Sequence, residues 1–229
     1  MNISFQEFIK ELIKYKLILL GEIHGTKEIP YEIKKIITSL THHNLKKVFF
    51  EAPIEEQKYL DDFIKTGSIS SLNNIPSFKY KENSDGRNSK EYLDLIEYLR
   101  SKKTVKIFFV DSIKGDLNKR DLNIYKNIKK LISKDEGLSI FITGNIHAYT
   151  EIINLKDIKM KTTGYYLKKD LKDKLASVNF IPANGNFYNL GLKKINKKYN
   201  LSKITIKRTN KGYEYDYLIP KVSPCSFMH

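Results

Sequence analysis

The chain has 229 residues, a formal net charge of +15 and a single cysteine, Cys225. This length suits one α/β domain with a sizeable core. One cysteine excludes an intrachain disulfide and favours a reducing compartment, so we expect a cytoplasmic protein. No apolar run approaches the roughly 18 residues that a membrane span needs, and the amphipathic N-terminal segment does not resemble a signal peptide.

The positive charge comes almost entirely from lysine, because the chain holds only four arginines: Arg87, Arg100, Arg120 and Arg208. Recognition of phosphates and bases favours arginine, whose planar guanidinium donates two parallel hydrogen bonds. The lysines are spread over nearly every predicted helix and loop, which argues against a nucleic-acid partner. Since the composition avoids arginine, each arginine becomes a candidate for a specific role.

Helices and strands are predicted to alternate through the first 155 residues, from apolar spacings of three and four and from continuous apolar runs. The predicted helices span 3–14, 28–41, 54–65, 89–102, 119–133 and 148–154. The predicted strands span 16–20, 46–51, 105–111 and 138–143, and a polar loop is expected at 66–88. Continuous apolar strands separated by helices indicate a mainly parallel central sheet flanked by helices.

The pattern changes from about residue 160. A short Lys-rich helix is predicted over 163–175, and four strands follow it at 176–181, 186–192, 202–208 and 213–219. Glycine and asparagine mark the turns between these strands. We therefore expect a β-rich C-terminal extension (about 176–220) of the same sheet, within a single α/β domain whose core spans about 15–192.

Polar residues follow all four of the first predicted strands. The first and fourth strands each lead into a Gly-x-x-His segment, at residues 21–24 and 144–147, while the second and third end in Glu51 and Asp111. In open α/β sheets, ligands bind outside the carboxyl ends of the strands. The sequence therefore predicts a functional site at that edge of the sheet.

Two imidazoles and two carboxylates at this edge would support two kinds of water activation. One uses a divalent metal such as Mn, Zn or Co, and the other uses a histidine as a general base without metal. A nearby arginine would stabilise an oxyanion or hold a substrate carboxylate or phosphate. The catalytic candidates are Glu22, His24, Glu51, Arg120 and His147; the metal-ligand candidates are Glu22, His24, Glu51 and His147; the substrate-binding candidates are Arg87, Asp111 and Asn145. Asp121 is a weaker candidate.

Several short motifs together resemble the erythromycin esterase-like proteins, a family grouped with the ChaN-like haem-uptake proteins, the TraB proteins and the Tiki proteases. They are Leu20-Gly21-Glu22-Ile23-His24-Gly25, the strand-terminal Glu51, Arg120-Asp121-x-x-x-x-x-Asn127 and Gly144-Asn145-Ile146-His147-Ala148. The stretches 163–168 and 184–187 add to the resemblance, which covers roughly residues 17–190. It implies an α/β fold with its cleft at the strand ends.

Each branch of this group implies a different activity. In the esterase branch, the residue matching His24 would be the base that activates water, with Glu22, Glu51, Arg120 and His147 around the cleft. In the Tiki branch, similar positions are associated with metal-dependent peptide hydrolysis, and in the ChaN branch the related fold binds haem. This chain is much shorter than the esterases and lacks a large helical insert, so macrolide hydrolysis is not expected.

We therefore expect a hydrolase that cleaves an ester or amide of a small-molecule or peptide substrate. The alternative is a haem- or other ligand-binding protein without catalysis, since haem needs a broad apolar slot with an axial histidine or tyrosine. Two glutamates beside two histidines favour hydrolysis over haem binding. A third alternative is RNA or DNA binding by the basic surface, which a strong salt dependence would reveal. The sequence leaves the oligomeric state open.

Overall fold

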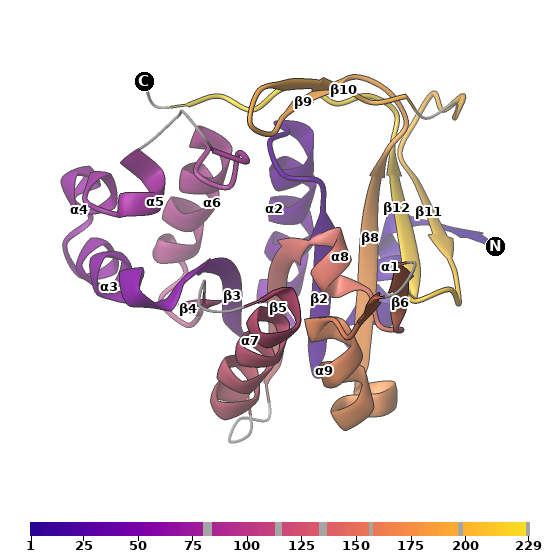
Figure 1. Cartoon of the computed structure of the whole chain (residues 1–229), viewed down its shortest axis with the longest axis horizontal. Helices are drawn as coiled ribbons and strands as arrows, with labels where there is room; N and C mark the ends of the chain where they lie inside the picture. Colours follow the sequence, from indigo (N-terminus) through magenta and orange to yellow (C-terminus); the bar gives the residue numbers. More distant parts are fainter. Residues whose placement is uncertain (80–83, 113–115, 133–136, 156–157, 197–198, 228–229) are drawn as a thin grey trace.

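An eight-stranded sheet with the order β1-β11-β12-β8-β2-β5-β3-β4 forms the centre of the molecule (Figure 1). The structure is a computed structural model that describes residues 1–79, 84–112, 116–132, 137–155, 158–196 and 199–227. All strand pairs from β12 to β4 are parallel, and β11 is antiparallel to both of its neighbours. The mainly parallel sheet flanked by helices is confirmed, together with C-terminal strands that join it.

The central strands are buried along their whole length, which is why they appear in the sequence as continuous apolar runs. The sheet comprises β1 (Asn2–Ile3), β2 (Leu17–Glu22), β3 (Leu45–Pro53), β4 (Lys106–Asp111), β5 (Leu138–Gly144), β8 (Leu175–Pro182), β11 (Thr205–Arg208) and β12 (Tyr215–Ile219). Two hairpins stand apart from it: β6 (Ile153–Leu155) with β7 (Ile158–Met160), and β9 (Asn186–Tyr188) with β10 (Leu192–Lys194).

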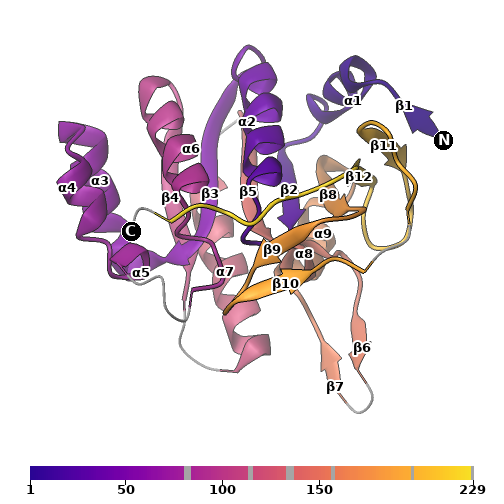
Figure 2. The same ribbon diagram turned by 90° about the horizontal axis from the view of Figure 1, so that it is seen from above.

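Helices cover both faces of the sheet, as the view from above shows (Figure 2). One face carries α1 (Phe5–Leu12), α2 (Glu28–Thr41), the 3₁₀ turn η1 (Ile54–Glu56), α3 (Gln57–Thr66), α4 (Ile69–Asn73), α5 (Pro76–Lys79) and α6 (Lys90–Ser101). The other carries α7 (Leu117–Ile132), α8 (Asn145–Ala148), α9 (Thr163–Leu171) and the 3₁₀ turn η2 (Lys172–Lys174). The buried apolar residues accordingly form two clusters, one for each face.

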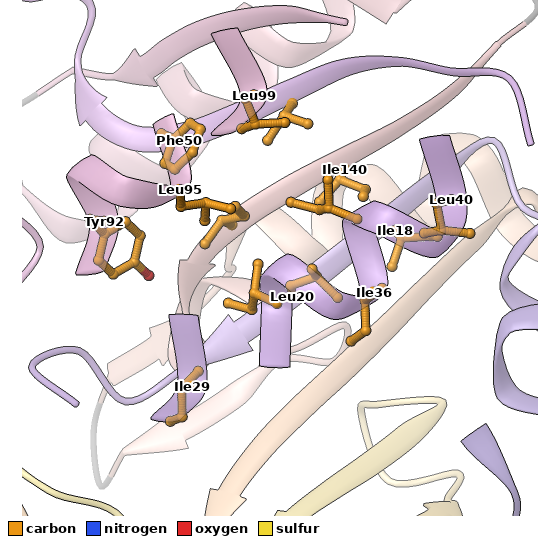
Figure 3. Packing of buried hydrophobic residues seen from close by; sticks show 14 of the residues in the cluster. Ile18, Leu20, Ile29, Ile36, Leu40, Phe50, Tyr92, Leu95, Leu99 and Ile140 are labelled. Atoms are coloured by element: carbon orange, nitrogen blue, oxygen red, sulfur yellow. The ribbon is translucent and has the colours of Figure 1, made fainter. Parts of the chain in front are cut away.

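The larger cluster joins the sheet to α2 and α6 (Figure 3). Leu20 and Ile140 of the sheet lie there among Ile36 of α2 and Leu95 and Leu99 of α6, all of them at most 1 % exposed. Burying such a side chain contributes about 1.5–3 kcal/mol. The strands and the helices above them therefore form a rigid support for the residues at the strand ends.

The helix predicted over 148–154 is wrong. The chain forms only the single turn α8, and Thr150 then donates its backbone N–H to Gly212 O at 2.8 Å, while its hydroxyl donates to the same oxygen. A backbone N–H used in this way cannot continue a helical ladder. The chain enters the β6–β7 hairpin instead, which the sequence analysis did not predict.

Two other predictions need correction. The segment 66–88 is not a continuous loop, because it contains α4 and α5; residues 80–83 within it lie outside the described part of the chain. The strand predicted over 186–192 is divided into β9 and β10, because Leu190 and Gly191 both have positive φ and turn the chain back. This hairpin does not join the main sheet.

The C-terminal segment (residues 222–227) crosses the top of the molecule in Figure 1 and forms backbone hydrogen bonds with two elements beneath it. Cys225 N donates to Gly25 O at 2.9 Å, and Lys90 N donates to Ser226 O at 2.8 Å. The segment thereby joins the turn after β2 to the start of α6. Among the described residues, no helix is both long and apolar enough to cross a bilayer.

Candidate active site

Charged side chains and one backbone N–H group from the ends of four neighbouring strands converge at the carboxyl edge of the sheet. His24 follows β2, Glu51 lies near the end of β3, Asp111 ends β4 and Gly144 ends β5. Parallel strands bring these ends together although the residues are far apart in the chain. This is the edge at which the sequence places the site.

Glu51 is the centre of the cluster, and its side chain is only 4 % exposed. Its Oε1 accepts hydrogen bonds from Arg87 Nη1 at 2.8 Å and Arg120 Nη2 at 2.6 Å. Its Oε2 accepts hydrogen bonds from Thr143 Oγ1 at 2.5 Å and the Gly144 backbone N–H at 2.7 Å. A buried carboxylate with this many donors is held in one orientation.

Glu51 is ionised in this environment. Burial alone would raise the pKa of its carboxyl group, but the positive charges of His147, Arg87, His24 and Arg120 outweigh burial and hold the pKa well below its ordinary value. The site therefore contains a fixed negative charge, which stabilises positive charge on the imidazoles nearby.

His24 is oriented by Glu22, two residues before it. The distance from His24 Nδ1 to Glu22 Oε1 is 2.6 Å, and the hydroxyl of Tyr92 on α6 donates to the same carboxylate oxygen. Because Nδ1–H donates to the carboxylate, Nε2 is left as the free acceptor of the neutral ring. That Nε2 lies 3.8 Å from Glu51 Oε2.

Burial on its own would lower the pKa of His24, but the charge of Glu22, the hydrogen bond to it and the charge of Glu51 raise the pKa above its ordinary value. Loss of the hydrogen bond from His24 Nδ1–H to Glu22 would remove the main cause of this rise in the pKa. His24 is therefore a stronger base than a histidine in water.

His147 lies on α8 and is oriented by a carboxylate from another element. Its Nδ1 is 2.8 Å from Asp121 Oδ1, and the same oxygen accepts hydrogen bonds from the backbone N–H and the hydroxyl of Thr163. Its Nε2 lies 3.4 Å from Arg120 Nη1 and 3.6 Å from Glu51 Oε1. Burial would lower the pKa of His147, but Glu51 and Asp121 raise it.

Each of the two arginines holds a second carboxylate. Arg120 donates from Nε to Asp111 Oδ1 at 2.9 Å and from Nη2 to Asp111 Oδ2 at 2.6 Å. Arg87 donates from Nε to Asp85 Oδ2 at 2.8 Å. The guanidinium groups are thus largely occupied by acidic partners. Among the described residues, Arg120 Nη1 has a hydrogen-bond partner only in His147, so one of its two N–H groups remains for another acceptor.

A cavity of about 620 Å³ opens beside these groups. Its charged side is formed by His24, Glu51, Asp85, Arg87, Asp111 and Arg120, and its apolar side includes Phe50, Ile96, Phe109 and Ile142. This volume is typical of sites for small molecules. His24 lines the cavity, whereas His147, whose Nε2 lies near Arg120 Nη1, is not among the lining residues.

The structure brings together Glu22, His24, Glu51, Arg87, Asp111, Arg120 and His147. Asn145, a predicted substrate-binding residue, is not among the lining residues of the cavity, and its carbonyl accepts a hydrogen bond from Tyr213. Tyr92, Asp85 and Thr143 were not predicted. Asp85 stands directly before Gly86-Arg87, a turn pattern that could have indicated it.

The donor set does not suit the predicted metal ion. Among the described residues, no three His, Cys, Asp or Glu side chains are arranged as metal ligands. Glu51 Oε1 already lies between two guanidinium groups, and a divalent cation there would meet two positive charges. Glu22 and Asp121 are turned to the Nδ1 atoms, away from the Nε2 atoms that would bind a shared ion.

No protein-family model and no curated protein matches the chain. Solved structures share its fold. A succinoglycan biosynthesis protein matches with a TM-score of 0.75 at 12 % identity, covering 96 % of this chain and 91 % of that one. A mutant erythromycin esterase, EreC, in its open conformation matches with a TM-score of 0.74 at 8 % identity, covering 99 % and 96 %.

The haem-binding protein ChaN of Campylobacter jejuni matches with a TM-score of 0.54 at 16 % identity, covering 94 % of this chain and 92 % of that one. At such identities the likenesses show the fold alone. It is the fold of erythromycin esterase and ChaN, as the sequence resemblance implies.

Proposed function

We propose that the protein is a hydrolase that cleaves an ester or amide with water activated by His24, without a metal ion. One observation carries this proposal: His24 lines the cavity with its Nδ1 held by Glu22, which leaves its Nε2, beside the ionised Glu51, as the free ring nitrogen. A base needs this arrangement, an unprotonated nitrogen turned to the substrate and a carboxylate behind the ring. The shared fold with an erythromycin esterase supports the proposal.

In the first step, His24 Nε2 removes a proton from water, and the hydroxide attacks the carbonyl carbon of the substrate. The imidazolium that forms is stabilised by Glu22 at one nitrogen and by the charge of Glu51 near the other. The negative charge that develops on the carbonyl oxygen would be stabilised by the N–H that Arg120 Nη1 retains. The imidazolium then returns its proton to the leaving alcohol or amine.

Haem binding is the second candidate, and the likeness to ChaN favours it. The haem iron would be held by His24 through Nε2, the nitrogen that Glu22 leaves free, because His24 lines the cavity. That nitrogen lies 3.8 Å from the ionised Glu51, so a porphyrin there would have to displace the Glu51–Arg87 and Glu51–Arg120 pairs. We therefore rank hydrolysis first.

The test is hydrolysis of activated esters and anilides by the purified protein in the presence of EDTA. We expect ester cleavage that survives the chelator and that falls about 10²–10⁴-fold in His24→Asn, the usual contribution of a general base. The matched control is His43→Asn, an exposed histidine beyond the end of α2, which should retain the activity. Undiminished activity in His24→Asn, or activity abolished by EDTA, would contradict the proposal, and a Soret shift without hydrolysis would favour haem binding.

A further inference from the structure

The two sides of the cavity differ sharply in chemistry. On the apolar side, Phe50 and Phe109 from neighbouring strands stack edge to face at 6.4 Å between ring centroids, and Ile96 of α6 and Ile142 of β5 join them. These side chains, each at most 4 % exposed, form the apolar wall of the cavity beside the charged cluster. Water against such a wall is displaced favourably by an apolar group of a ligand.

The charged side is net negative, although the chain as a whole carries +15. Among the described lining residues, three carboxylates (Glu51, Asp85 and Asp111) face two guanidinium groups, and His24 is paired with a further carboxylate, Glu22. The excess of negative charge remains whether His24 is protonated or neutral. A ligand carboxylate or phosphate would meet repulsion here.

The arginines could not offset this repulsion by binding a ligand anion. Arg87 uses Nε and Nη2 for Asp85 and Nη1 for Glu51, and Arg120 uses Nε and Nη2 for Asp111 and Glu51. Binding a new anion through two parallel hydrogen bonds would require one of these ion pairs to break, and in the pairs with Glu51 and Asp111 this would leave a buried carboxylate without its partner. The site thus has one N–H donor, on Arg120, for an oxyanion that forms during the reaction. It has no free guanidinium edge that could bind the carboxylate or phosphate of a ligand through two hydrogen bonds.

We infer that the substrate is an uncharged ester or amide whose acyl group is an extended hydrocarbon chain bound against Phe50, Ile96, Phe109 and Ile142. This inference rests on the proposed function for the reaction, but the selection of an uncharged apolar group follows from the cavity alone. The carbonyl lies at the boundary of the two sides, within reach of His24 and Arg120. The hydrocarbon chain extends along the wall toward the rim at Pro53 and Pro76.

The first test compares p-nitrophenyl esters at low substrate concentration. Each methylene buried against the wall should raise kcat/KM about fourfold, so the butyrate ester should exceed the acetate ester by about tenfold or more. The hemisuccinate ester, which has the same chain length as butyrate but ends in a carboxylate, should be at least about tenfold slower than butyrate. Equal rates for acetate and butyrate, or a preference for hemisuccinate, would overturn the inference.

Ala52 offers a variant that alters the hydrocarbon side without removing a core side chain, because it is half-buried and lines the cavity. Ala52→Leu should reduce the ratio of butyrate to acetate kcat/KM to near one by filling the space. Ser101→Leu, at the exposed end of α6, is the matched control and should keep the ratio of the unmodified protein. An unchanged ratio in Ala52→Leu would contradict the assigned acyl position.

A binding experiment with the unmodified protein separates this inference from the proposed function. Hexanamide and hexanoate have equal chains and differ in charge, and calorimetric titration should show saturable binding of the amide with at least about tenfold weaker binding of the carboxylate. Selective amide binding without ester hydrolysis would reject the proposed function and retain the inference. Hydrolysis together with equal or stronger binding of hexanoate would reject the inference and retain the proposed function.

Discussion

The two Gly-x-x-His segments have the same pattern and lie on neighbouring strands, yet their glycines meet different needs. β2 and β5 pair so that Gly21 is opposite Thr143 and Glu22 is opposite Gly144. A Cβ on Gly21 would lie 2.7 Å from Ala148 Cβ, so this glycine allows α8 to pack against β2. A Cβ on Gly144 would lie 3.1 Å from His24 Nε2 and 3.6 Å from Glu51 Oε2, so this glycine leaves space inside the reactive cluster.

The histidines differ in the same way. Each has a carboxylate on Nδ1, but His24 lines the cavity, whereas His147 does not, and its Nε2 lies 3.4 Å from Arg120 Nη1. Equal sequence patterns and equal orientation of the rings therefore do not give equal roles. What lies opposite Nε2 decides the role, and we infer that His24 is the base and His147 a positioning residue for Arg120 and Glu51.

The largest effect should come from Glu22, the carboxylate behind the ring of His24. In Glu22→Gln, the amide can donate to Nδ1, which places the proton on Nε2 and prevents His24 from accepting one from water. We expect ester hydrolysis to fall about 10²–10⁴-fold, as measured by kcat at saturating substrate. Asp121→Asn makes the matched change behind His147 and should cost less than about tenfold; equal losses in the two variants would contradict the separate roles.

The two glycines give a smaller effect that separates chemistry from stability. Gly144 has φ −58° and ψ 144°, which an alanine adopts readily, so Gly144→Ala should fold normally but lose about 10²-fold in kcat because the methyl group displaces the attacking water. Gly21→Ala should instead lower the free energy of unfolding by about 1–3 kcal/mol through overpacking against Ala148. Denaturant unfolding together with ester kinetics checks both. Full activity in Gly144→Ala would place the water elsewhere.

The sheet was predictable from the sequence because its strands are buried on both faces and therefore consist of continuous runs of apolar residues. The segment that follows β5 was not predictable, because a single turn of helix followed by a hairpin has no hydrophobic periodicity of its own. There, a contact between Thr150 and Gly212, distant in sequence, decides where the helix ends. Tertiary contacts of this kind override local preference.

Scarcity of arginine proved informative for the candidate site. Arg87 and Arg120 both hold Glu51, and the remaining two also make specific contacts, Arg100 with Ile64 O and Arg208 with Glu11. Tyr92, by contrast, could not have been found. It stands at a core-facing position of α6, where the spacing indicates only an apolar contact, and its hydroxyl reaches Glu22 because α6 packs beside α2 on that face of the sheet.

The smallest effect concerns pH. Hydrolysis should increase with pH as His24 loses its proton, with a midpoint above the ordinary histidine pKa of about 6.5 because Glu22 and Glu51 raise it. Tyr92→Phe removes a hydrogen-bond donor from Glu22, so the Glu22 carboxylate interacts more strongly with the imidazolium of His24. The midpoint should therefore move upward by less than about one pH unit. Tyr98→Phe, on the same helix but bonded to Thr38, is the control and should leave the midpoint in place. A downward shift in Tyr92→Phe would contradict the proposed effect of Tyr92 on Glu22. A rate that falls as pH increases from acid to neutral would mean that the protonated ring is the active form and that His24 acts as an acid instead.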